Sequence, residues 1–379
     1  KILSFRLFVG VGLISYSLYL WHYPIFSFAK NLEFFQGYFG KLILIFVSFI
    51  LSIFTYYFIE QPARKTKFVK TVFSMMLLGV SLIFIYNVAV IKENGFLNRV
   101  KVKNYQDKHT FLYLTQEDKP CFGRSKNLCK FGSHEKEIIL LGDSHLGSLA
   151  FDLYNRTKSN YTFLPITNAG YFHLRDVKLL NKHTKKINTN YDALRNDFDK
   201  ILNKSRNNII IIGGVTSLYF YNKRIEGRAL HWDGLFVDED YLKYDVKIIE
   251  DAFINFIKEL SINNEVILLY PIPEIGVNLQ KKKFENMVRV FNYKYSDFLK
   301  QNKEVISFFD SINLPKVHKV YTYKVFCIEG ADLCSTHDKN NFFFFDGYHP
   351  SLEGAKMIND LIIKKINLIE TIKWMKKST

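Results

Sequence analysis

The chain has 379 residues, of which 48% are hydrophobic and 16% aromatic, and its formal net charge is +16. This composition allows two or three units with a large buried core and excludes a low-complexity chain. The positive charge fits a lysine-rich surface or attraction to an anionic lipid or glycan. Because the zinc-knuckle, aromatic and basic-zipper patterns of nucleic-acid-binding proteins are missing from the sequence, we expect no nucleic-acid partner.

Three long apolar runs come first in the chain, over residues 7–29, 42–59 and 71–91. Each is close to the roughly 20 residues that a helix needs to cross a bilayer. A core helix of a soluble protein rarely stays uncharged over such a length. We therefore expect three transmembrane helices within residues 1–91.

The distribution of positive charge predicts how these helices are oriented, since Lys and Arg are enriched in cytoplasmic loops. Four basic residues separate the second and third runs, namely Arg64, Lys65, Lys67 and Lys70. We expect this loop in the cytoplasm, a multi-pass inner-membrane location, and residues 92 onward in the periplasm or outside the cell. Because the first residue is Lys1 and not Met, we also expect this sequence to be a fragment of a longer chain.

The four cysteines form two close pairs in the sequence, Cys121 with Cys129 and Cys327 with Cys334. Neither pair has a histidine at zinc-site spacing, so two local disulfides in an oxidising compartment are the interpretation that fits best. Cross-pairing between the two sites and four unpaired thiols are the alternatives.

From residue 137 onward, short apolar runs alternate with longer helical segments, which predicts an α/β domain with a parallel sheet. The expected strands cover residues 137–142, 161–166, 208–213, 265–270 and 305–310. The clearest expected helices cover 191–205, 243–261 and 280–301, and a last helix runs from 351 towards 368. We take residues 137–379 as the catalytic domain and 92–136 as an extension that links it to the last span and packs on it.

The first strand ends in "LLGDSHLGSL", which places Ser144 at a turn between a strand and a helix. A serine there is exposed at the carboxyl edge of the sheet, where α/β proteins bind their ligands. Amides at the start of the following helix could hold an oxyanion. The plain alternative is that Asp143 and Ser144 only cap the helix.

A second motif, "FFFFDGYHPSLEGA", contains Asp346 and His349 three positions apart. The carboxyl group of Asp346 can then reach the near ring nitrogen of His349, which leaves the far nitrogen to take a proton from Ser144. This is the logic of a Ser-His-Asp triad. The alternative is that Asp346 caps a turn and His349 is a surface residue.

Together the two motifs resemble the SGNH hydrolase superfamily, whose blocks are Gly-Asp-Ser and Asp-x-x-His. The resemblance covers about residues 137–370 and implies a three-layer, flavodoxin-like α/β fold. It implies Ser144 as nucleophile, His349 as base, Asp346 as its partner, and the amides of Ser144 and Gly170 as the oxyanion hole. The third block departs from the superfamily, because "IIIIGGVTSLYF" lacks the usual Asn side chain.

The segments "ISYSLYLWHYPIF" and "FIEQPARK" resemble the end of the membrane acyltransferase-3 family. That family includes members in which one further span carries an SGNH domain. The resemblance implies an O-acyltransferase that moves an acetyl group, with acetyl-CoA as donor, to a hydroxyl of lipopolysaccharide, lipooligosaccharide or peptidoglycan. The partners it implies are the glycan acceptor, the lipid bilayer and the missing N-terminal helices of the same chain. Trp21 and His22 could instead belong to an aromatic belt.

Two other functions are the alternatives. The same triad could serve a membrane-tethered esterase that deacetylates glycans, and the departure in the third block favours a non-catalytic glycan-binding domain. We expect neither a metal ion nor a cofactor bound to this part of the chain, since no cluster has ligand spacing. His145 is expected to support the site or to begin the helix, with substrate contact as the alternative. Trp232 could stack on a sugar or simply pack in a loop.

Overall fold

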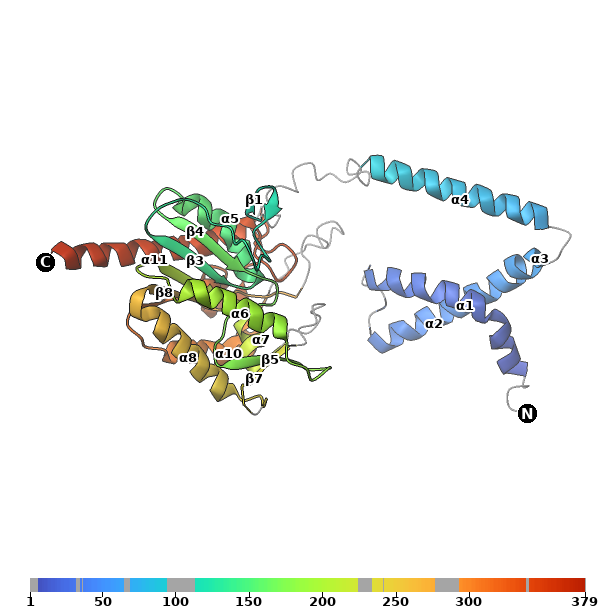
Figure 1. Cartoon of the computed structure of the whole chain (residues 1–379). Helices are drawn as coiled ribbons and strands as arrows, with labels where there is room; N and C mark the ends of the chain where they lie inside the picture. Colours follow the sequence, from blue (N-terminus) through green and yellow to red (C-terminus); the bar gives the residue numbers. More distant parts are fainter. Residues whose placement is uncertain are drawn as a thin grey trace. The chain divides into compact units, whose positions relative to one another are not determined.

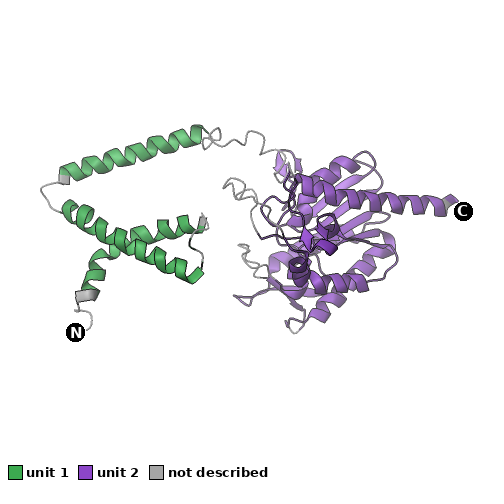
Figure 2. Cartoon of the chain, turned by 180° about the vertical axis from the view of Figure 1, so that it is seen from behind, with its two compact units in different colours: residues 1–99 green, residues 100–379 purple. Residues whose placement is uncertain are grey.

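The computed structural model describes residues 6–31, 35, 37–64, 69–93, 113–223, 234–240, 242–276, 293–338 and 341–378. The chain divides into two compact units, Lys1–Arg99 and Val100–Thr379 (Figure 1, Figure 2). Trp232 and most of the helix expected over 280–301 lie outside the described residues.

The N-terminal unit is entirely helical. Its helices are α1 (Arg6–Asn31), α2 (Gly37–Thr55), a π-helical turn η1 (Tyr56–Glu60), α3 (Gln61–Ala63) and α4 (Val69–Lys92). Among the described residues, two helical stretches are long and apolar enough to cross a membrane, Gly37–Ala63 and Lys70–Lys92. Helix α1 covers the first expected span but falls short of that standard, because serine, tyrosine, tryptophan and histidine interrupt its apolar run.

Two side-chain hydrogen bonds join α1 to the helix that follows it. The indole Nε1 of Trp21 donates to Oγ1 of Thr55 (2.8 Å), and the hydroxyl of Ser17 donates to Oε2 of Glu60 (2.9 Å). The Ser17–Glu60 bond connects the two segments on which the resemblance to membrane acyltransferases rests, and Thr55 lies three residues before the second segment. Polar groups placed between apolar helices fix their mutual position.

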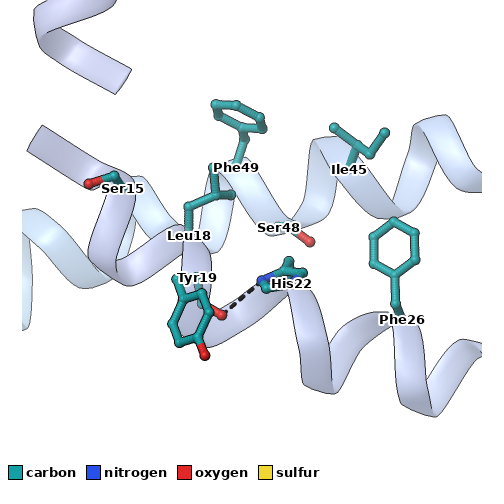
Figure 3. A pocket seen from close by; sticks show the side chains of 8 residues that line it. All are labelled: Ser15, Leu18, Tyr19, His22, Phe26, Ile45, Ser48 and Phe49. Carbon is teal, nitrogen blue, oxygen red and sulfur yellow. Dashed lines mark hydrogen bonds between the residues drawn. The ribbon is translucent and has the colours of Figure 1, made fainter. Parts of the chain in front are cut away.

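A cavity of about 420 Å³ lies between α1 and α2, and Figure 3 shows the side chains that line it. His22 points into the cavity from α1, and its Nδ1 donates to the carbonyl oxygen of Tyr19 (2.8 Å). The other lining residues are Ser15, Leu18, Tyr19, Phe26, Ile45, Ser48 and Phe49. The cavity is therefore apolar apart from one imidazole and a few hydroxyl groups.

The C-terminal unit is built on a five-stranded sheet in the order β4-β3-β6-β8-β9, with every neighbouring pair parallel. The strands are β3 (Glu137–Gly142), β4 (Thr162–Thr167), β6 (Ile209–Gly213), β8 (Glu265–Leu269) and β9 (Val317–Val320). Ile138, Ile139, Leu140 and Leu141 on β3 are all at most 1% exposed. Successive residues of a strand face opposite sides, so both faces of the sheet are covered.

Helices α5 (Ser144–Thr157) and α11 (Leu352–Ser378) pack against each other, and α5 also contacts β3 and β4. A second group of helices packs together, namely α7 (Thr216–Tyr221), α8 (Val246–Asn263) and α10 (Tyr295–Ser311), and α8 lies on β8. Helix α6 (Thr189–Leu202) and the antiparallel pair β5 (Val177–Asn181) and β7 (Gly234–Asp238) complete this unit (Figure 1). The observed domain is an α/β fold with a parallel sheet.

The fifth expected strand is wrong. Residues 305–310 belong to α10, and the fifth strand is β9. The run "VISFF" satisfies either structure, but Phe298, Val305 and Phe309 are buried at helical spacing along α10. Strand β9 is a short, half-buried edge strand that contains His318 and Lys319, so its sequence lacks the apolar signal of the inner strands.

Both cysteine pairs form local disulfides, Cys121–Cys129 and Cys327–Cys334. The first closes the loop of residues 121–129, which directly follows the hairpin of β1 (Thr115–Gln116) and β2 (Lys119–Pro120). Arg124 holds this loop by donating to the carbonyl oxygens of Pro120, Asn127, Gln116 and Lys119. The loop packs on the domain, since Gly123 N donates to Thr167 O (2.9 Å) at the end of β4.

The second disulfide joins the strands β10 (Cys327–Ile328) and β11 (Leu333–Cys334), which follow the 3-10 helix η4 (Thr322–Val325) and enclose another, η5 (Glu329–Ala331).

Candidate active site

Ser144 lies where the strand β3 passes into helix α5. The strand ends at Gly142, Asp143 is the N-cap, and Ser144 is the first helical residue. The Ser144 side chain is partly exposed, while His145 behind it is buried. The helix start therefore presents the hydroxyl at the carboxyl edge of the sheet, and its first-turn amides have no carbonyl partner within the helix.

The structure brings Ser144, His349 and Asp346 into one hydrogen-bonded row. Nε2 of His349 lies 2.8 Å from Oγ of Ser144, and Nδ1 of His349 lies 2.8 Å from Oδ2 of Asp346. Because a carboxylate only accepts, Nδ1 donates to it and Nε2 is left to accept from the serine hydroxyl. Residues 205 positions apart in the sequence thus form the geometry of a nucleophile, a base and an orienting acid.

A tight turn before α11 fixes the carboxyl group of Asp346. Its Oδ1 accepts from the amides of Tyr348 and His349, both at 2.9 Å, and Gly347, between Asp346 and Tyr348, has a φ of +90°. Burial alone would raise the pKa of Asp346, but the hydrogen bonds and charge of His349 and the two amides outweigh it and lower the pKa to about 2. The group is therefore ionised across the physiological range, as an orienting carboxylate must be.

Asp143 has a different role from its neighbour Ser144. Its side chain is 1% exposed. Oδ1 accepts from His145 N, and Oδ2 accepts from Val215 N and the Tyr219 hydroxyl, each at 2.8 Å. Asp143 therefore caps α5 and at the same time ties the β3–α5 turn to the turn after β6.

Comparison with known proteins now identifies the domain. The model of the family described as "SGNH domain (fused to AT3 domains)" matches residues 113–364. The chain belongs to this SGNH family. A search of curated proteins found no match to this chain.

Three solved structures illustrate what the SGNH domain is similar to. The periplasmic domain of a lipopolysaccharide acetyltransferase from Salmonella ser. Paratyphi A is 16% identical, with 62% of this chain and 85% of that chain covered and a TM-score of 0.40. A lipolytic G-D-S-L protein from Veillonella parvula is 13% identical, with coverages of 60% and 97% and a TM-score of 0.30. An acetyl xylan esterase from Butyrivibrio proteoclasticus is 12% identical, with coverages of 64% and 65% and a TM-score of 0.31.

His145 has an acidic neighbour in the SGNH domain that the sequence did not reveal. His145 is 1% exposed, and its Nε2 lies 3.4 Å from Oε1 of Glu274, which is 4% exposed. The rings of His145 and His349 meet edge to face at 5.4 Å. His145 therefore packs against the ring of His349, which fits the expectation that it supports the site. No sequence motif marked Glu274.

The loop that carries Glu274 also binds the turn that contains Asp346 and His349. The amides of Ile275 and Gly276 both donate to the carbonyl oxygen of Gly347, at 2.7 and 3.1 Å. Gly347 lies between Asp346 and His349. The segment after β8 thus contacts both the ring of His145 and the turn that contains His349.

The two expected oxyanion donors are the backbone amides of Ser144 and Gly170, and the structure gives the position of each in the fold. Ser144 N belongs to the first turn of α5, and Gly170 lies three residues beyond β4 with a φ of +62°. Beyond β6, a Cβ on Gly214 (φ +149°) would lie 2.8 Å from Oδ2 of Asp143, so glycine lets that carboxyl group approach. That the amide of Gly170 is the second oxyanion donor stays a prediction.

Among the described residues, no group of three or more His, Cys, Asp or Glu side chains could hold a metal ion.

Proposed function

We propose that this SGNH domain transfers an acyl group, most simply acetyl, to a hydroxyl group of a cell-envelope glycan. The observation that carries the proposal is the row of two 2.8 Å hydrogen bonds from Ser144 through His349 to Asp346. A serine is a weak nucleophile unless a base takes its proton, and this row supplies the base in the required tautomer.

In the first step, Oγ of Ser144 attacks the carbonyl carbon of the acyl donor while its proton passes to Nε2 of His349. The carbonyl oxygen becomes an oxyanion, for which the amides of Ser144 and Gly170 are the proposed donors. The intermediate then collapses, the bond to the leaving group breaks, and His349 returns the proton to that group. An acyl ester on Ser144 remains.

In the second step, His349 takes the proton of a glycan hydroxyl whose oxygen attacks the acyl carbon. Collapse breaks the bond to Oγ of Ser144, which regains a proton from His349. Throughout both steps, Asp346 stabilises the imidazolium form of His349 by charge and hydrogen bond.

The membrane helices give this reaction its proposed setting. We take α1, Gly37–Ala63 and Lys70–Lys92 as three spans of an inner-membrane protein, with the loop around Arg64 in the cytoplasm and the SGNH domain outside. Local disulfides on the domain agree with an oxidising compartment. Acetyl-CoA is the proposed donor on the cytoplasmic side, and upstream spans of the same chain would pass the acetyl group across.

Reconstituted full-length protein tests the proposal. A chromogenic acetyl ester serves as donor and an envelope oligosaccharide as acceptor, and both dye release and acetylated glycan are measured. We expect Ser144→Ala to abolish both signals. Ser148→Ala, on the same helix, should leave both unchanged, since that hydroxyl donates only to the His145 carbonyl oxygen of its own helix (2.6 Å).

The same experiment separates the two rival functions. Dye release that is fast and indifferent to acceptor, with no acetylated glycan, indicates an esterase, in which water takes the place of the sugar hydroxyl. Glycan acetylation that survives Ser144→Ala indicates a domain that only binds glycan.

A further inference from the structure

The outer half of helix α11 has an apolar stripe that the domain does not cover. The first part of the helix buries Ile358, Ile362, Ile366 and Ile369 against the domain. The C-terminal part of the helix projects past the sheet (Figure 1). Leu368, Ile372 and Met375 are 49%, 37% and 48% exposed.

The stripe follows one line along the helix. Leu361, Leu368, Ile372 and Met375 are seven, four and three positions apart, which places them within one narrow sector of a helix with 3.6 residues per turn. Lys364 and Lys365 flank that sector, one on each side. The pattern is an apolar strip with a basic border.

The stripe opens at its inner end into a groove of about 260 Å³ between α11 and the end of β9. Four lysines and four mainly apolar residues line the groove. They are Lys319, Lys324, Lys364 and Lys365, and Val320, Tyr321, Leu361 and Leu368. Positive charge therefore surrounds an apolar floor.

The one acidic residue in this last part of α11 forms an ion pair on the side of the helix that faces the domain. Residues 361–379 contain five lysines and one acidic residue, Glu370. Glu370 pairs with Lys136 (2.5 Å), and Lys373 pairs with Glu265 (2.9 Å), both on the domain side. These ion pairs hold the end of the helix to the domain. Lys364 and Lys365 line the groove instead, so the face of α11 that carries the stripe, which we call the outer face, is strongly basic.

We propose that this outer face of α11, together with its groove, docks the SGNH domain on an anionic phospholipid bilayer. An apolar stripe bordered by lysines is the pattern of helices that lie in the membrane interface, where the stripe enters the acyl boundary and the lysines meet the headgroups. An acidic soluble partner would use the lysines but not the exposed Leu368, Ile372 and Met375.

A bilayer is available to the domain through its own chain, in which Gly37–Ala63 and Lys70–Lys92 are long and apolar enough to cross a membrane. The outer end of the stripe is also far from the active site, because Met375 lies 23 residues along α11 from Leu352, about 35 Å away. The proposal therefore stands independently of the acyl-transfer chemistry.

An environment-sensitive dye tests the docking in full-length protein reconstituted into vesicles. The dye is attached through Met375→Cys, with Asn367→Cys as a matched control on another side of the same helix. No described cysteine is free, so the introduced thiol is the labelling site. We compare vesicles of phosphatidylcholine with vesicles that also contain phosphatidylglycerol.

With phosphatidylglycerol we expect a blue shift of dye emission at position 375 and none at position 367. The shift should be lost in high salt and in the double variant Lys364→Gln, Lys365→Gln. No shift at position 375 in anionic vesicles overturns the proposal. An equal shift in both lipids overturns it too, because it means that another apolar surface, such as the chain's own membrane helices, covers the stripe.

Discussion

Replacing Asp143 with alanine should destabilise the SGNH domain more than any replacement within the triad. Three donors at 2.8 Å would lose their acceptor: His145 N, Val215 N and the Tyr219 hydroxyl. A buried donor left unsatisfied costs about 1–3 kcal/mol. Partial access of water to the widened site lowers the sum, so we expect a loss of about 3–6 kcal/mol, against a total stability of about 5–15 kcal/mol for a domain.

Pulse proteolysis over a urea series measures this loss in the full-length protein, because it follows cleavage of the SGNH domain alone. Asp143→Asn is the matched control. It keeps one oxygen for the His145 amide and should cost about 1–2 kcal/mol. A loss below about 1 kcal/mol for Asp143→Ala would refute the assigned hydrogen bonds.

Three further predictions concern the triad, the glycine beside Asp143 and the first disulfide. Asp346→Asn should lower kcat/KM on the order of 10³-fold, because His349 loses the carboxylate that fixes its tautomer; a loss under about tenfold contradicts this role. Since the folded pKa of Asp346 is lowered to about 2, its ionised form stabilises the domain above the unfolded pKa of about 3.9. The difference in unfolding free energy between wild type and Asp346→Asn, about 1–2 kcal/mol at neutral pH after allowing for partial exposure, should therefore vanish as the pH falls from about 4 to 2. Gly214→Ala places a Cβ 2.8 Å from Oδ2 of Asp143 at a φ of +149° and should cost about 1–3 kcal/mol in the same proteolysis assay, whereas unchanged stability would show that the turn relaxes freely. Reduction of Cys121–Cys129, which closes a loop of sequence separation 8, should cost about 2.5 kcal/mol by loop entropy, and a urea midpoint indifferent to reductant contradicts this.

The inner strands and the triad could be predicted from the sequence because each depends on a strong local signal. Strand β3 coincides with the expected 137–142, since its continuous Ile and Leu can only be buried on both faces. Asp346 and His349 are neighbours on one turn, so their contact is nearly a local property. Their contact with Ser144 follows from the rule that ligand-binding residues gather at the carboxyl ends of parallel strands.

The features that could not be predicted depend on tertiary context. Val305 and Phe309 suit a strand as well as a helix, and only burial along α10 decides between them. Glu274 lies in a loop with no motif, and its meaning comes from the distance to His145. The hydrogen bonds from Trp21 and Ser17 to the following helical segment could not be predicted either, because they join residues 34 and 43 positions apart in the sequence.

The central claim is that Ser144 is the nucleophile of a working triad, and covalent labelling tests it most directly. Full-length protein is treated with a fluorophosphonate, and the modified peptide is found by mass spectrometry. The account predicts a single adduct on Ser144 that is lost in His349→Ala, because without its base the serine 2.8 Å away is no longer activated. Absence of an adduct on Ser144 in the folded wild-type protein, or equal labelling of His349→Ala, would contradict it.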